Sequence, residues 1–148
     1  MKIFVDADSC PKPVRDIIRK AAKRTRGAVF AANRPIPGIG NDEMWICSPE
    51  SGSADNAIAE RAGPGDIAVT RDIALAARLI KTGAAVLDDR GRIYTAENIR
   101  ERLSVRNFTV GLAENGVNFD RKARYGKREL KAFADSLDRL ITRLSRAV

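Results

Sequence analysis

The chain has 148 residues, 44% of them hydrophobic, and a formal net charge of +8. This length suits one domain with a sizeable core, and we expect a single domain over residues 1–148. Neither a membrane-length apolar run nor a signal-peptide pattern is present, so we expect a cytoplasmic protein with no membrane partner. The absence of histidine excludes Ser-His-Asp and Cys-His nucleophiles and His-based zinc sites, and two cysteines are too few for a disulfide framework.

The charge is distributed unevenly along the chain. Residues 1–34 carry +6, residues 35–89 carry −5 and residues 90–148 carry +7. An acidic centre between basic flanks suits a metal-binding cluster beside a surface that meets a polyanion such as nucleic acid. The alternative is a solvated basic surface that binds no ligand.

Two aspartates follow the first apolar run directly. Ile3, Phe4 and Val5 are not diluted by polar residues, which is typical of a strand buried on both faces of a parallel sheet. Asp6 and Asp8 then fall at the carboxyl end of that strand, where open parallel sheets bind their ligands. Neighbouring carboxylates repel unless a cation or proton neutralises them, and Mg²⁺ and Mn²⁺ prefer oxygen ligands. A metal site is favoured; the alternative is that both residues only cap the following turn.

A helix is predicted between Pro11 and Gly27. Apolar residues recur there at helical spacing and form one stripe. The cationic outer face includes Arg15 and Arg19. That face would track phosphates, or it is an ordinary solvated helix face.

The next segment is predicted to be two strands and a helix. The strands cover residues 28–32 and 44–47, and Arg34 lies in the Pro- and Gly-rich loop between them, where it would point towards a substrate. The helix covers residues 54–62 and carries Asp55 in its first turn. Because an acid at this position complements the helix dipole, Asp55 taken alone would be structural.

A fourth strand is predicted over residues 66–70. Asp72 comes just after its carboxyl end, whereas Asp66 opens the strand and lies at the opposite edge of the sheet. If the first and fourth strands are parallel neighbours, Asp6 and Asp72 share the edge where a ligand binds. Asp72 also suits the N-cap of the next helix, which ends at Gly83.

The alternation of strands and helices predicts an α/β fold with a largely parallel sheet of about five strands. The remaining predicted elements are a strand at 84–87, a hairpin return at 92–94, a helix at 97–103, a flexible basic segment at 104–126 and a long amphipathic C-terminal helix at 127–147. The last helix is expected to pack against the domain; the alternative is the seam of a homodimer, because its spacing is near heptad.

Three stretches resemble the YaiI/YqxD family of uncharacterised bacterial proteins. They are Asp6-Ala7-Asp8-Ser9-Cys10-Pro11, Ala54-Asp55 and residues 65–76, GDIAVTRDIALA. The resemblance covers residues 2 to about 106 and resumes in the final helix. It implies a single PIN-like domain, and PIN-like domains are metal-dependent nucleases that act mostly on RNA.

The resemblance also implies roles for individual residues. By position, Asp6, Asp55 and Asp72 match the catalytic acids, and Thr70 matches a hydroxyl residue before the last acid. A fourth acid that often follows in PIN nucleases is absent here, and Asp8 would compensate as a further metal ligand. Residues 107–128 lack the Gly- and Pro-rich pattern of the family. The candidate substrate-binding residues are Thr70, Arg71, Arg34, Arg15 and Arg19.

The expected activity is therefore hydrolysis of RNA phosphodiesters, with Mg²⁺ or Mn²⁺ held by the four aspartates and activating water. Two alternatives remain at this stage. In a haloacid-dehalogenase-like phosphatase, Asp6 would be the nucleophile and Asp8 the acid/base, with Asp88 and Asp89 a metal pair. The other alternative is a non-catalytic nucleic-acid-binding protein with a degenerate acidic cluster.

Overall fold

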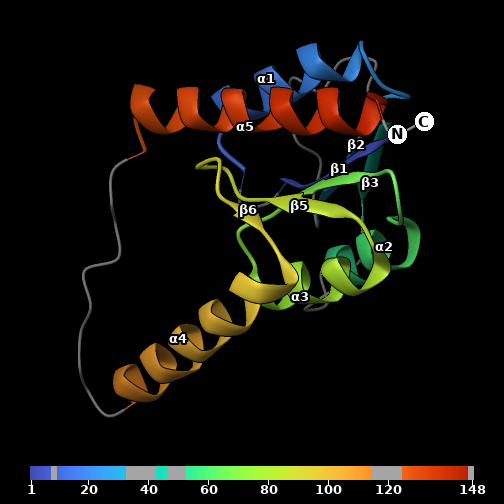
Figure 1. Ribbon diagram of the computed structural model, residues 1–148. Coiled ribbons are helices and arrows are strands. Elements are labelled where there is room, and N and C mark those ends of the chain that lie inside the picture. The colour runs from blue at the N-terminus through green and yellow to red at the C-terminus, as the bar shows by residue number, and fades with distance from the viewer. Residues whose placement is uncertain (8–9, 33–42, 47–52, 115–124, 147–148) are drawn as a thin grey trace.

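The structure is a computed structural model that describes residues 1–7, 10–32, 43–46, 53–114 and 125–146 (Figure 1). In chain order the elements are β1 (Ile3–Asp6), α1 (Lys12–Ala22), β2 (Ala28–Ala32), β3 (Glu43–Ile46), α2 (Ser53–Arg61), β4 (Ile67–Val69), α3 (Ile73–Thr82), β5 (Ala85–Leu87), β6 (Ile93–Tyr94), α4 (Ala96–Glu114) and α5 (Lys127–Arg146).

The strands form one sheet in the order β3-β2-β1-β4-β5-β6. All neighbouring pairs are parallel except β5 and β6, which are antiparallel and form the predicted hairpin return. The hairpin strand makes the sheet six-stranded instead of about five. The chain winds outward from β1 in one direction and from β4 in the other, so the strand order reverses between β1 and β4. In doubly wound sheets, ligands bind outside the carboxyl ends of the strands at this point.

Helices cover both faces of the sheet, and each face has its own core. Figure 1 shows α1 and α5 on one side of the strands, with α2 and α3 on the other. Successive residues of β1 alternate between the two cores: Ile3 and Val5 join the α1–α5 side, and Phe4 joins the α2–α3 side. All four residues of β1 are buried, as predicted from its undiluted apolar run.

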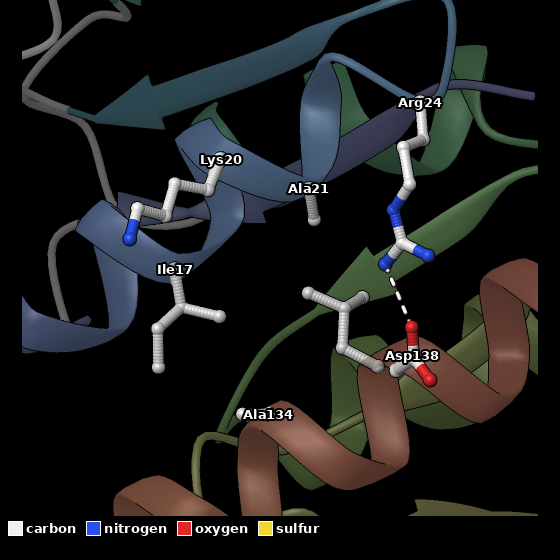
Figure 2. A pocket seen from close by; sticks show the side chains of 7 residues that line it. Ile17, Lys20, Ala21, Arg24, Ala134 and Asp138 are labelled. Carbon is white, nitrogen blue, oxygen red and sulfur yellow. Dashed lines mark ion pairs between the residues drawn. The ribbon is translucent and has the colours of Figure 1, made fainter.

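The C-terminal helix α5 packs inside the domain, as expected for its amphipathic stripe. Phe133, Leu137 and Leu140 are each at most 1% exposed and belong to the α1-side core. Their burial means that this stripe does not provide the homodimer seam considered as an alternative. On the surface, α1 and α5 flank a hollow of about 260 Å³, which is bridged by an Arg24–Asp138 ion pair of 2.8 Å (Figure 2).

The prediction for residues 104–126 was wrong in part, because α4 continues as a helix to Glu114. The helix begins at Ala96, one residue before the predicted start, and just ahead of it Thr95 and Asn98 exchange hydrogen bonds between side chain and backbone, at 2.8 and 3.1 Å. Beyond its first turns α4 leads away from the sheet (Figure 1). The sequence of α4 has no apolar stripe on one side, so periodicity did not reveal its full length. Within the described ranges, no helix is long and apolar enough to cross a membrane.

The turn between β5 and β6 comes unusually close to α5 at Gly91. Gly91 has φ +83°, and its carbonyl oxygen accepts a hydrogen bond from the Ser136 hydroxyl at 2.6 Å. A Cβ atom at this position would overlap the Ala132 carbonyl and lie 2.9 Å from the Phe133 amide nitrogen. Both the backbone conformation and the available space therefore require glycine here.

Candidate metal and phosphodiester site

The candidate acids converge at the carboxyl edge of the sheet, where the strand order reverses. Asp6 is the last residue of β1, and Asp72 follows the adjacent strand β4. Asp55 lies in the first turn of α2, a helix that packs against α3 and β1. The parallel pairing of β1 with β4 is the condition under which Asp6 and Asp72 were predicted to share an edge, and it is met.

Thr70 links the ends of β1 and β4. Its buried hydroxyl donates a hydrogen bond to Asp6 Oδ2 at 3.1 Å and accepts one from the Asp72 backbone N–H at 3.0 Å. Asp6 itself is only 9% exposed. Thr70 thus orients one carboxylate and fixes the backbone that carries another, which makes it a positioning residue.

Asp72 has the structural role that was predicted beside the functional one. It is the N-cap of α3, and its Oδ1 accepts hydrogen bonds from the backbone N–H groups of Ala74 and Leu75, at 2.9 and 3.2 Å. The second carboxylate oxygen is not used by the cap. Asp72 therefore caps the helix with one oxygen, and its negative charge acts on Asp55 of α2.

The acids lie close enough to affect one another's protonation. Partial burial raises the pKa of Asp55 from 3.8 to about 6, and the negative charges of Asp6 and Asp72, together with a hydrogen bond to the Asp72 side chain, add to the shift. Burial and the neighbouring carboxylates together make Asp55 hold its proton more tightly than an isolated carboxyl group does. A divalent cation would neutralise the same charge.

The Asp55 pKa predicts a stability change with pH. Because the folded state binds the proton more tightly than the unfolded state, the free energy of unfolding falls as pH rises from about 4 to about 6. We expect Asp55→Asn to stabilise the metal-free protein at pH 8 by about 1 kcal/mol, after allowing for solvent screening of this partly exposed group, and to have little effect at pH 4. Urea unfolding of both proteins across this range measures the difference. A difference that is the same at pH 4 and pH 8 would contradict the assignment.

Two further carboxylates, Asp88 and Asp89, follow β5 and lie beside the acidic cluster. Asp89, only 3% exposed, accepts both Arg71 Nε at 2.6 Å and an Arg71 terminal nitrogen at 2.5 Å on one carboxylate oxygen. Asp88 Oδ1 accepts the backbone N–H groups of Arg90 and Arg92, both at 2.9 Å. Both carboxylates, the proposed metal pair of the phosphatase alternative, thus have partners within the protein.

Cys10 and Arg15 complete the surroundings of Asp6. Burial, reinforced by the charges of Asp89 and Asp6, raises the pKa of the Cys10 thiol to about 12, so the thiol stays protonated at neutral pH. An Arg15 guanidinium nitrogen donates to the Cys10 carbonyl oxygen at 2.7 Å. This contact holds Arg15, one of the predicted substrate-binding residues, near the acids.

The remaining predicted residues divide into three groups. Asp8 and Arg34 lie outside the described residues. Arg19 is one turn beyond Arg15 on α1 and is partly exposed. Asp66 lies at the opposite edge, as predicted, where it accepts the backbone N–H groups of Lys2 and Gly63 at 3.0 and 3.1 Å. Over the described ranges, no three Cys, Asp or Glu side chains are grouped closely enough to hold one metal ion.

Comparison with known proteins assigns the chain to a family. Residues 4–143 match the model of the uncharacterised YaiI/YqxD family. The chain belongs to this family. Relatives named UPF0178 protein include one from Myxococcus xanthus, 47% identical over 97% of this chain and 96% of its own, and one from Treponema pallidum, 45% identical over 99% and 84%. No solved structure matches the chain.

Sequence reasoning on this YaiI/YqxD family member missed the Arg71–Asp89 pair. The two residues follow neighbouring parallel strands, β4 and β5, so strand order alone would have placed them together. It also missed Tyr125, which is 36 residues from Asp89 in the sequence. The Tyr125 hydroxyl donates a hydrogen bond to the Asp89 carbonyl oxygen at 2.7 Å. Nothing in the local pattern around Tyr125 indicates that contact.

Proposed function

We propose that this protein is a divalent-metal-dependent nuclease that hydrolyses phosphodiesters, preferably those of single-stranded RNA. The observation that carries the proposal is that Asp6, Asp55 and Asp72 lie at the edge where the strand order reverses, where partial burial and the neighbouring carboxylates raise the pKa of Asp55 to about 6. The implied metal is Mg²⁺ or Mn²⁺, with Asp6, Asp8, Asp55 and Asp72 as ligands.

The chemistry of the donors suits such an ion, while among the described residues no three of these side chains are grouped closely enough to hold it. The donors are carboxylate oxygens, which hard divalent cations prefer. Asp55 holds a proton beside Asp72, as its raised pKa indicates. A cation would replace that proton, because ligating carboxylates must be deprotonated.

When bound, the ion would supply Lewis-acid activation of water and neutralise charge on the phosphodiester. The chain's own residues supply positioning. Thr70 holds Asp6, and the α3 cap holds Asp72. Arg15 and Arg71, fixed by the Cys10 carbonyl and by Asp89, are placed to bind substrate phosphates beside the acids.

Metal binding is expected to raise the melting temperature. At about 100 times the dissociation constant, a ligand of the folded state adds about 2.7 kcal/mol, or about 5–10 °C for a chain of this size. The shift should be larger at pH 8 than at pH 5, because Asp55 must lose its proton to bind the ion. Thermal unfolding with and without millimolar Mg²⁺ or Mn²⁺ measures both effects.

Asp66→Asn is the control for this experiment, because Asp66 lies at the opposite edge and should leave the metal shift unchanged. Asp55→Asn should reduce the shift. If the wild-type protein melts at the same temperature with and without metal while still binding RNA, the alternative of a non-catalytic nucleic-acid-binding protein replaces the nuclease.

A further inference from the structure

The side chain of Trp45 lies between two hollows at the β3 edge of the sheet. One hollow, of about 360 Å³, is lined by Trp45 and Arg61 together with Ala57 and Glu60 of α2. The other, of about 410 Å³, opens at the amino-terminal ends of the strands and shares Trp45 and Arg61 with the first. Both volumes fall in the range of small-ligand pockets. Trp45 and Arg61 therefore form the common wall of two neighbouring hollows.

The Trp45 ring is held in place by contacts with two other elements. Its centroid lies 5.9 Å from that of Phe4 on β1, with the ring planes tilted by 56°. The Arg61 guanidinium, at the end of α2, lies 5.3 Å from the Trp45 ring centroid. The ring is only partly buried, so it combines a fixed orientation with accessible surface.

The charges of the larger hollow suit an anion. Lys2, Arg26 and Arg61 line it, and Asp66 is the acid among its described lining residues. Both Asp66 carboxylate oxygens already accept backbone hydrogen bonds. Because the Arg61 guanidinium already lies over the indole ring, a base would stack on the outer side of this Trp45–Arg61 pair, with its phosphate near Arg26.

We propose that Trp45, Arg61 and Arg26 form a stacking site for one nucleotide of single-stranded nucleic acid, separate from the acidic cluster. The choice of a strand over a free nucleotide rests on the proposed function. Asp55 and Arg61 belong to the same helix, six residues apart, or about 9 Å along its axis. A strand bound at the acids would therefore have another nucleotide within reach of Trp45.

The test uses Trp45 as its own reporter, because it is the only tryptophan of the chain. A short single-stranded DNA oligonucleotide is titrated in EDTA, so that no metal-dependent cleavage takes place. We expect saturable quenching of the tryptophan fluorescence, with the same dissociation constant as the anisotropy of an end-labelled oligonucleotide. A duplex of the same sequence should not quench, because its bases are already stacked.

Variants separate stacking from charge. Arg61→Gln retains the reporter and should weaken binding several-fold, lowering the salt slope by about 0.7. Trp45→Leu should weaken binding by about five- to 150-fold in the anisotropy assay with an unchanged salt slope, and Trp45→Phe should restore part of the loss. Lys81→Gln, at an exposed cation on α3, is the matched control and should leave affinity within about twofold of wild type.

Several results would overturn the stacking site. These are no binding in EDTA, binding without a change in fluorescence, or equal quenching by the duplex. Quenching by free AMP as strong as that by the oligonucleotide would replace the strand with a free nucleotide. Circular dichroism melting of the Trp45 variants excludes misfolding, and Arg61→Gln tests the proposal without altering the ring. Because no metal is present, these outcomes are independent of whether the aspartates support cleavage.

Discussion

Asp6→Asn is expected to reduce metal-dependent RNA cleavage by about 10³-fold, since the loss of about 4 kcal/mol of transition-state stabilisation has that effect. Asn keeps the shape of the side chain and its hydrogen bond from Thr70 but loses the charge. Asp72→Asn should be as severe. The double variant should cost little more than either single change, because residues that act as one unit are strongly non-additive. Initial rates of cleavage of a labelled RNA measure all four proteins.

Asp66→Asn is the matched control, with the same chemical change at the opposite edge of the sheet. At saturating RNA it should keep cleavage close to the wild-type rate, because Asp66 lines the hollow beside Trp45 and not the acidic cluster. Full activity in Asp72→Asn, or equal losses in Asp66→Asn and Asp6→Asn, would refute the assignment of the site. If Asp88→Asn abolished hydrolysis of an aryl phosphate while Asp55→Asn did not, the phosphatase alternative would take its place.

Gly91→Ala is expected to destabilise the protein by about 2–4 kcal/mol, among the larger effects of single substitutions. The new Cβ would overlap the Ala132 carbonyl of α5, and the residue would be held at φ +83°. Because the overlapping atoms belong to a helix backbone, relief requires α5 to move, and core contacts such as those of Phe133 would be lost. The expected fall in melting temperature is about 5–15 °C.

Gly65→Ala separates strain from overlap. Gly65 has a similar φ of +88°, but no atom lies within 4 Å of a Cβ built there. Its substitution should cost only the backbone strain, about 1 kcal/mol. If the two variants melted at the same temperature, the close approach of Gly91 to α5 would have no energetic importance.

The carboxyl edge could be predicted because its signals are local. The apolar runs that end at Asp6 and Asp72 define two parallel strands, and a strand has a direction, so Asp66 was assigned correctly to the other edge. Asp55 could not be placed in this way. Its position in a first turn suits a structural acid equally well, and only the family resemblance linked it to the other two.

Contacts between distant segments were beyond local reasoning. The hydrogen bond from Tyr125 to the Asp89 carbonyl depends on where the chain returns after α4, and no periodicity encodes that path. The contact between Trp45 and Arg61 likewise joins the edge strand β3 to the end of α2, 16 residues further along the chain. The length of α4 was missed for a different reason, since a helix leading away from the sheet lacks the one-sided pattern by which helices are recognised.

The packing of α5 determines when this protein can finish folding. The chain leaves the ribosome from its N-terminus at about 5–20 residues per second, so β1, α1 and β4 are all made before α5. Until α5 arrives, the part of the α1-side core that Phe133 and Leu137 complete remains open to water. That core closes only after the ribosome has finished synthesising α5. Until then its exposed apolar surface is a target for chaperones and a site for aggregation.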